Sequence, residues 1–227
     1  MAASPSPRTR TTVAAKATMA VTGIVLLSFV LGHMAGNLQV FLGPEAMNSY
    51  AEFLHDFGHG LALWVVRAVL LACLVLHVAS AAYVVRVSKA ARPVGYVMKK
   101  DVATDFAART MWMTGLIVLA FLVYHLLHFT IDPLGAYHDF VDAEGRHDVH
   151  RMVVTAFQSL PTVAVYVVAQ VLLAIHISHG GSSLFQTLGW RSPRNAKWVD
   201  RIGPTLAAVI LVGNLFIPLG VFAGLAS

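Results

Sequence analysis

Long runs of apolar residues dominate the hydropathy pattern of this chain. A helix that crosses a bilayer needs about 20 mostly apolar residues, because it rises about 1.5 Å per residue through a hydrocarbon layer of about 30 Å. Windows of that length lie at about 15–41, 61–87, 109–131, 156–180 and 203–225. The pattern therefore predicts an all-α integral membrane bundle of five transmembrane helices, with residues 1–227 forming a single membrane domain.

The composition agrees with a membrane protein and limits the chemistry that the chain can carry alone. Hydrophobic residue types make up 57% of the 227 residues and charged types only 12%, against about 25% charged in an average soluble domain. The single cysteine, Cys73, excludes an internal disulfide and a cluster held by about four cysteine thiolates of this chain. No dinucleotide-binding or P-loop fingerprint is present. Flavin or iron–sulfur chemistry would therefore belong to a partner.

Basic and acidic residues alternate between successive loops. Basic residues precede the first span and gather around the loops between spans two and three and between spans four and five: Arg8, Arg10, Lys16, Arg86, Lys89, Arg92, Lys99, Lys100, Arg109, Arg191, Arg194, Lys197 and Arg201. The other two loops are mainly acidic, with Arg146 and Arg151 as exceptions. The positive-inside rule then predicts a cytoplasmic N-terminus and an external C-terminus. Topology explains the net charge of +5, so nucleic acid is not an expected partner.

Each of the first four predicted spans contains a histidine, and the third and fourth contain a second one. Because the spans alternate in direction, His33 and His125 should lie toward the outer face. His77 and His176 should lie toward the cytoplasmic face. Two histidines at one depth can ligate a haem iron from opposite sides, so we expect two haems with irons roughly 10–20 Å apart in depth. Hydrogen bonding between helices is the alternative for any single histidine.

Two further histidines leave the ligand assignment open. His128 follows His125 by three residues on nearly the same helical face, and His179 follows His176 in the same way. Either could replace its neighbour on the iron. We favour the first of each pair for its depth. The second of each pair lies nearer the membrane surface, where it could contact a haem propionate, a quinone or water.

Three other residues are candidates for cofactor contacts. Arg67 lies inside the second span, where it should pair with a carboxylate such as a propionate of the outer haem, or extend to the outer interface. Glu52 and His59 precede that span on the outer side. Quinone reduction consumes protons, so both are candidates for a quinone site; a solvated loop is the alternative.

The motifs around these residues resemble the single-chain, five-helix cytochrome b anchor subunit of succinate dehydrogenases and fumarate reductases. The likeness covers almost the whole chain and rests on the order and spacing of residues 32–38 (GHMAGNL), 64–77 (WVVRAVLLACLVLH), 124–129 (YHLLHF), 176–180 (HISHG) and 185–190 (FQTLGW). In that family one histidine on each of the first four helices ligates haem, which matches His33, His77, His125 and His176.

The resemblance also implies cofactors, partners and a location. It implies two b haems, a bound quinone with menaquinone favoured over ubiquinone, and a flavoprotein subunit and an iron–sulfur subunit docked on the cytoplasmic side. The chain would lie in a bacterial cytoplasmic membrane and pass electrons to quinone, with no succinate chemistry of its own. The alternatives are the dihaem cytochrome b of another quinone-linked complex, such as a hydrogenase or formate dehydrogenase, and a haem-free transporter or anchor. Transporters usually show internal repeats, and we recognise none in the sequence.

Overall fold

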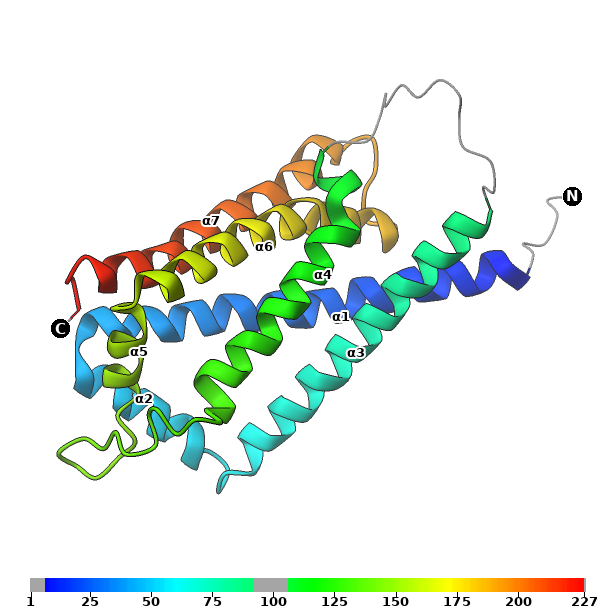
Figure 1. Ribbon diagram of the computed structural model, residues 1–227. Helices are drawn as coiled ribbons and strands as arrows, with labels where there is room; N and C mark the ends of the chain where they lie inside the picture. The colour runs from blue at the N-terminus through cyan, green and yellow to red at the C-terminus, as the bar shows by residue number, and fades with distance from the viewer. Residues whose placement is uncertain (1–6, 92–105, 227) are drawn as a thin grey trace, which may run out of the picture.

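A computed structural model describes residues 7–91 and 106–226 of the chain. In chain order, the described elements are α1 (Pro7–Asn37), the 3₁₀ helix η1 (Leu38–Leu42), α2 (Pro44–Asp56), α3 (Leu61–Ala90), α4 (Phe106–Leu126), the π-helix η2 (Leu127–Ile131), α5 (Val149–Phe157), α6 (Leu160–Thr187) and α7 (Ala196–Phe222). Figure 1 shows the long helices running side by side with the short helices α2 and α5 at one end. Apart from one isolated β-bridge, the regular structure of this part is helical.

Five of these helices have the length and hydropathy of membrane spans, so the chain is a multi-pass membrane protein with the predicted fold class. The spans are Thr11–Leu42, Leu61–Ala90, Arg109–Ile131, Leu160–Thr187 and Ala196–Phe222. The fourth begins later than predicted because the helix breaks after Phe157 and restarts at Leu160, with Pro161 in its first turn. The fifth begins earlier than predicted, because polar residues at the membrane surface continue the helix beyond the apolar run.

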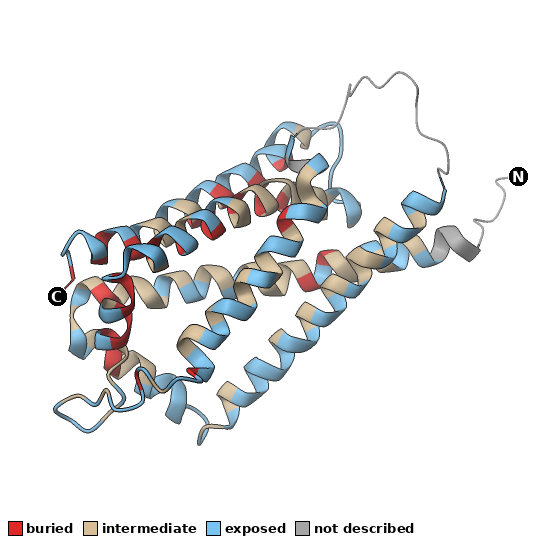
Figure 2. Ribbon diagram, in the orientation of Figure 1, coloured by how far each residue is buried: buried red, intermediate tan, exposed pale blue. Residues whose placement is uncertain are grey.

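Helices α6 and α7 form the most closely packed pair. Their backbones meet at Gly181 and Gly203, where a Cβ on Gly181 would lie 2.9 Å from the Gly203 Cα. The Asn214 amide on α7 donates to the Gln170 side chain on α6 over 2.8 Å. Small residues and interhelical hydrogen bonds are the usual means of joining helices in a membrane. Figure 2 shows most buried residues on this pair and on α5.

The helices that carry the four histidines form two pairs. Helix α3 packs mainly against α1, and α4 packs mainly against α6. No residue of α3 is buried, and Figure 1 shows α3 at the edge of the bundle. Helices α1 and α3 thus form one packed pair and α4 and α6 form the other. The four histidines lie between these two helix pairs.

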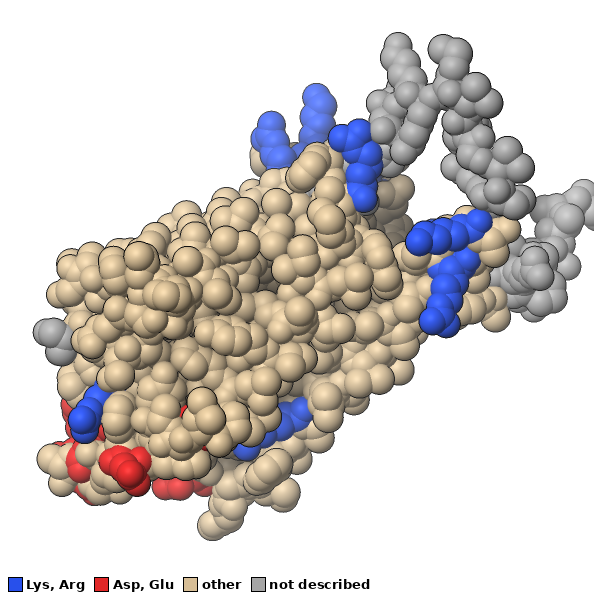
Figure 3. Space-filling view, in the orientation of Figure 1, with Lys and Arg blue, Asp and Glu red and all other residues tan. Residues whose placement is uncertain are grey.

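Charged residues gather at opposite ends of the bundle. In Figure 3, lysine and arginine side chains cluster near the end where α3 finishes and α7 begins. In the same view, acidic side chains gather at the end formed by α2 and α5, where Arg146 and Arg151 also lie. The predicted basic residues Arg92, Lys99 and Lys100 lie outside the described residues, as do the side chains of Arg8 and Arg10. The two ends nevertheless differ in charge, and the orientation of the bundle in the membrane stays a prediction.

Short helices close the acidic end. Helix α5 buries His150, Met152, Val153, Ala156 and Phe157, and the four apolar residues among them belong to an apolar core shared with η1, α6 and α7. The carboxylate of Asp148 caps α5 by accepting the Arg151 N–H over 2.9 Å. The acidic end is therefore a packed cap on the bundle.

Candidate functional site: two facing histidine pairs

The structure brings His33 of α1 and His125 of α4 together near the acidic end. Their ring centroids lie 5.7 Å apart with an interplanar angle of 84°. Phe29, one turn earlier on α1, stacks on the His33 ring at 5.3 Å and 18°. The two imidazoles therefore face each other from different helices, and an aromatic neighbour limits the rotation of one of them.

The second pair lies between α3 and α6. The ring centroids of His77 and His176 are 6.4 Å apart, with an interplanar angle of 60°. The Nδ1 atom of His77 lies 3.1 Å from the carbonyl oxygen of Met19 on α1. Because a carbonyl oxygen only accepts, Nδ1 of His77 must donate, and Nε2 is left with a free electron pair. That electron pair is what a metal ligand requires.

A tyrosine from α6 connects the two histidines near the end of α4. The Tyr166 hydroxyl oxygen lies 3.1 Å from Nδ1 of His125 and 3.1 Å from Nδ1 of His128. The other ring nitrogen of His128 lies 3.1 Å from the Tyr137 hydroxyl oxygen. Both nitrogens of His128 are therefore within hydrogen-bonding distance of tyrosines, whereas the contact with Tyr166 leaves Nε2 of His125 available. This arrangement favours His125 over His128 as the residue that faces His33.

The π-helix η2 positions this tyrosine cluster. It starts one residue before His128 and ends at Ile131; the next residue, Asp132, has a left-handed backbone with φ of 41°. The Asp132 carboxylate accepts the backbone N–H groups of Tyr137 and Ala136 over 2.8 and 3.0 Å. These bonds, led by that from Tyr137, hold the pKa of Asp132 below its usual range. The turn fixed in this way brings Tyr137 back toward His128.

The two pairs fit the geometry that a bis-histidine haem requires. Imidazoles that coordinate one iron from opposite sides, with metal–nitrogen bonds of about 2 Å, have ring centroids about 6 Å apart. The separations of 5.7 and 6.4 Å match this value. Within residues 7–91 and 106–226, no three His, Cys, Asp or Glu side chains gather as a bare metal ion would need. Each pair could supply two ligands to a metal whose other ligands come from a non-protein group, as they would in a haem.

The other candidate residues for haem contacts lie in different settings. Arg67 is exposed on α3, and its guanidinium lies over the Trp64 ring at 5.0 Å. No described carboxylate forms an ion pair with Arg67, so its predicted propionate partner stays a prediction. His179 lines a cavity of about 440 Å³ near the basic end, together with Lys16, Ser183 and other residues of α1 and α6. Lysine, histidine and serine there could bind an anionic group.

The two residues predicted for a quinone site lie at the acidic end without contacting each other. The Glu52 carboxylate on α2 lies 3.7 Å from an Arg146 guanidinium nitrogen. His59 lies in the exposed turn between α2 and α3, with a left-handed φ of 57°. Among the described residues no hydrogen bond or ion pair joins Glu52 to His59, so the structure does not assemble them into one site.

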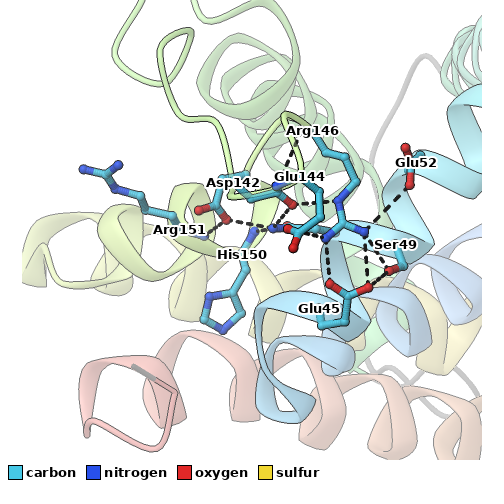
Figure 4. Close-up of polar contacts among 10 residues, drawn as sticks. Glu45, Ser49, Glu52, Asp142, Glu144, Arg146, His150 and Arg151 are labelled. Atoms are coloured by element: carbon cyan, nitrogen blue, oxygen red, sulfur yellow. Dashed lines mark hydrogen bonds and ion pairs between the residues drawn. The ribbon is translucent and has the colours of Figure 1, made fainter.

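Arg146 is the centre of the polar network at this end (Figure 4). Its guanidinium bonds the carboxylates of Glu45 and Asp142 over 2.7 Å each and that of Glu144 over 3.2 Å. The hydrogen bond from Arg146, followed by that from Ser49, lowers the pKa of Glu45 to about 2. The carboxylates of Glu45 and Asp142 in turn raise the pKa of Arg146. In the sequence Arg146 stood out only as an exception in an acidic loop, whereas in the structure it is one of the residues that join this loop to α2.

Several residues around the histidines escaped the sequence analysis. They are Thr22 and Thr114, which lie against His77 and His176, and Tyr166, which lies against His125. Threonine and tyrosine are common in membrane helices and gave no signal on their own.

Comparison with known proteins found no family model, curated protein or solved structure that matches this chain.

Proposed function

We propose that this chain is a dihaem cytochrome b that anchors a succinate:quinone oxidoreductase in the bacterial cytoplasmic membrane. The observation that carries the proposal is the pair of facing imidazole pairs, with ring centroids 5.7 and 6.4 Å apart, on four helices of a membrane bundle. The order and spacing of the residues resemble those of the five-helix anchor subunits. This resemblance is the reason for proposing succinate:quinone oxidoreductase as the complex.

In this proposal each histidine pair holds one haem b. His33 and His125 ligate the outer haem, and His77 and His176 ligate the inner one. Haem iron with two histidine ligands supplies one-electron transfer and offers no open position for oxygen chemistry. The protein holds the imidazoles at a fixed separation and provides Arg67, His128 and His179 as candidate contacts for propionates.

The charge distribution supports the proposed direction of docking. Basic side chains gather at the end opposite the acidic cap (Figure 3). In the proposed orientation this basic end faces the cytoplasm, where an iron–sulfur subunit and a flavoprotein subunit would bind and deliver electrons. Quinone, with menaquinone favoured, would accept those electrons inside the membrane, and Glu52 or His59 could supply protons if its site lies at the outer end.

The first test is the optical spectrum of the purified chain and of two histidine variants. We expect a reduced-minus-oxidised spectrum with a b-type α band and two haems per chain. His33→Ala and His77→Ala should each remove one haem, and the two lost haems should differ in midpoint potential. Absence of the α band in the wild-type chain would overturn the haem proposal. Loss of the same haem from both variants would overturn the pairing.

The partner complex needs a separate test. Gentle solubilisation of native membranes should co-purify the chain with a flavoprotein that holds flavin tightly and with an iron–sulfur protein. Succinate should then reduce both haems. A haem-containing chain that co-purifies instead with a hydrogenase or a formate dehydrogenase would overturn the succinate part of the proposal and leave its haem part standing.

A further inference from the structure

A short sequence occurs twice in this chain, once on α1 and once on α4. Residues 19–23 read MAVTG and residues 111–115 read MWMTG. Met19 precedes His33 by 14 residues, and Met111 precedes His125 by the same 14. This repeat corrects the sequence-based expectation of no internal repeat, which overlooked a match of only three identical residues in each copy.

The helices that follow repeat the same arrangement. His77 lies 16 residues after the first residue of α3, and His176 lies 16 residues after the first residue of α6. Helix α3 packs on α1 and α6 packs on α4. The chain therefore contains two copies of one helix pair, each with an outer histidine on its first helix and an inner histidine on its second. Helix α7 has no counterpart in this correspondence.

On α1 the repeated stretch holds the ring of His77. Nδ1 of His77 lies 3.1 Å from the Met19 carbonyl oxygen and 3.3 Å from the Thr22 hydroxyl oxygen. The Thr22 hydroxyl donates its own proton to the Thr18 carbonyl over 2.7 Å, so its electron pairs remain free to accept from the imidazole. A Cβ on Gly23 would lie 3.4 Å from Cε1 of His77. Glycine at this position lets the ring lie close to the α1 backbone.

The stretch on α4 holds His176 with the same residue types. Nδ1 of His176 lies 3.5 Å from the Thr114 hydroxyl oxygen, and the backbone of Met111 is a further hydrogen-bond partner of His176. The Thr114 hydroxyl donates to the Thr110 carbonyl over 3.1 Å. A Cβ on Gly115 would lie 3.3 Å from Cε1 of His176. Each copy of the repeat thus places a carbonyl, a hydroxyl and a glycine around one of two imidazoles that face each other.

Resting on the proposed function, we propose that Thr22 and Thr114, with the carbonyls and glycines of the two repeats, are positioning residues that fix the inner haem ligands His77 and His176. Each acceptor group keeps the proton on Nδ1 and directs the electron pair of Nε2 toward the space between the rings. Hydrogen bonding at the outer nitrogen of a ligating histidine also raises its basicity, which stabilises the oxidised metal. The two threonines therefore lower the reduction potential of the inner haem.

The contact of each buried hydroxyl with an imidazole nitrogen separates this role from ordinary helix packing. Thr22 is 5% exposed and Thr114 is 1% exposed. Each hydroxyl already donates its proton to a backbone carbonyl of its own helix. Valine would fill the same volume without a polar atom. The outer pair lacks this arrangement, since the Nδ1 partner of His125 is the hydroxyl of Tyr166 on α6. The repeat thus serves the inner pair alone.

Redox titration of both haems in Thr22→Val, Thr114→Val and the double variant tests this role. Thr22→Val should raise the inner reduction equilibrium constant about threefold to tenfold, which is about 30–60 mV at 59 mV per tenfold for one electron. Thr114→Val should have a smaller effect because its contact is longer. Haem content and the outer potential should stay unchanged. Thr205→Val, at an exposed threonine of α7, is the matched control and should shift neither potential.

A second pair of variants tests the close approach of the rings. Gly23→Val and Gly115→Val should displace the inner imidazoles and reduce the haem content from two to one, while the outer haem in the same molecule reports that the bundle has folded. Both haems at unshifted potentials in the double threonine variant would overturn this inference and leave the proposed function intact. A wild-type chain without haem would overturn the proposed function and this inference together.

Discussion

Replacing Asn48 by alanine should loosen the acidic end of the bundle and leave the histidine pairs folded. Asn48 on α2 is 1% exposed. Its amide nitrogen lies 3.2 Å from an Asp142 oxygen and 3.0 Å from an Asp148 oxygen, and its amide oxygen accepts the His150 N–H over 3.0 Å. One side chain therefore joins α2, the acidic loop and the start of α5.

The magnitude of the effect follows from the group that Asn48→Ala leaves without a partner. His150 is 4% exposed, so water cannot replace the lost acceptor of its N–H without opening the cap. A buried donor left without an acceptor costs about 1–3 kcal/mol, which corresponds to a local opening about 5- to 150-fold more frequent. The Asp142 carboxylate keeps its hydrogen bonds from Arg146 and the Asp148 carboxylate keeps that from the Arg151 N–H, so we add no free-energy cost for them.

Hydrogen–deuterium exchange of the chain in lipid nanodiscs measures this opening directly. Amides of the segment 142–152 should exchange about 5- to 150-fold faster in Asn48→Ala, whereas amides of α6 should be unchanged. Asn37→Ala is the matched control, because its amide donates to the His33 carbonyl on its own helix in an exposed position. Unchanged exchange of the His150 amide in Asn48→Ala would refute the reasoning, since that amide has no other acceptor in the structure.

Other variants test other contacts. Gly203→Ala should destabilise the protein by about 1–3 kcal/mol, because the new Cβ would collide with the α6 backbone; the thermal midpoint in detergent should fall, and Gly32→Ala, where a Cβ meets nothing within 4 Å, should leave it unchanged. Tyr166→Phe should change the reduction equilibrium of the outer haem about two- to tenfold and spare the inner one, because it removes one neutral hydrogen bond. The Arg146 hydrogen bond lowers the pKa of Glu45 from 4.5 to about 2, so Glu45 stabilises the fold fully above about pH 4.5 and loses this effect as the pH falls toward 2. Glu45→Gln should therefore lower the thermal midpoint at pH 6 and have no effect near pH 2; an equal effect at both values would contradict the assignment.

The long helices could be predicted because hydrocarbon demands a long apolar run, and such a run is visible in the sequence. The short helices α2 and α5 could not, because they lie at the membrane surface, where polar and apolar residues mix. The break between Phe157 and Leu160 was missed for a related reason, since apolar residues continue on both sides of it. Hydropathy reports the environment of a segment and gives little information about where its backbone turns.

The histidines could be found because an ionisable side chain in an apolar run is conspicuous. The sequence also predicted which rings share a depth, and the structure brings together the same two pairs. Thr22 and Thr114 were not predicted, because a threonine in a membrane helix can bond its own backbone and needs no partner. The role of Arg146 depends on Glu45, about one hundred residues away in sequence, and only the tertiary fold reveals that contact.

The exposure of α3 has a consequence for how such a protein is assembled. Apolar helices in a lipid bilayer gain little from contact with one another unless they pack closely or share polar bonds. Helix α3 buries no residue and packs mainly against α1, so the chain alone joins it to α1 and leaves it few contacts with α4, α6 and α7. If His77 ligates a haem, insertion of that haem completes the bundle by attaching α3 to α6. In cells starved of haem, the second span should then stay joined to α1 alone, and membrane proteases should degrade that form of the chain faster than the haem-bound form.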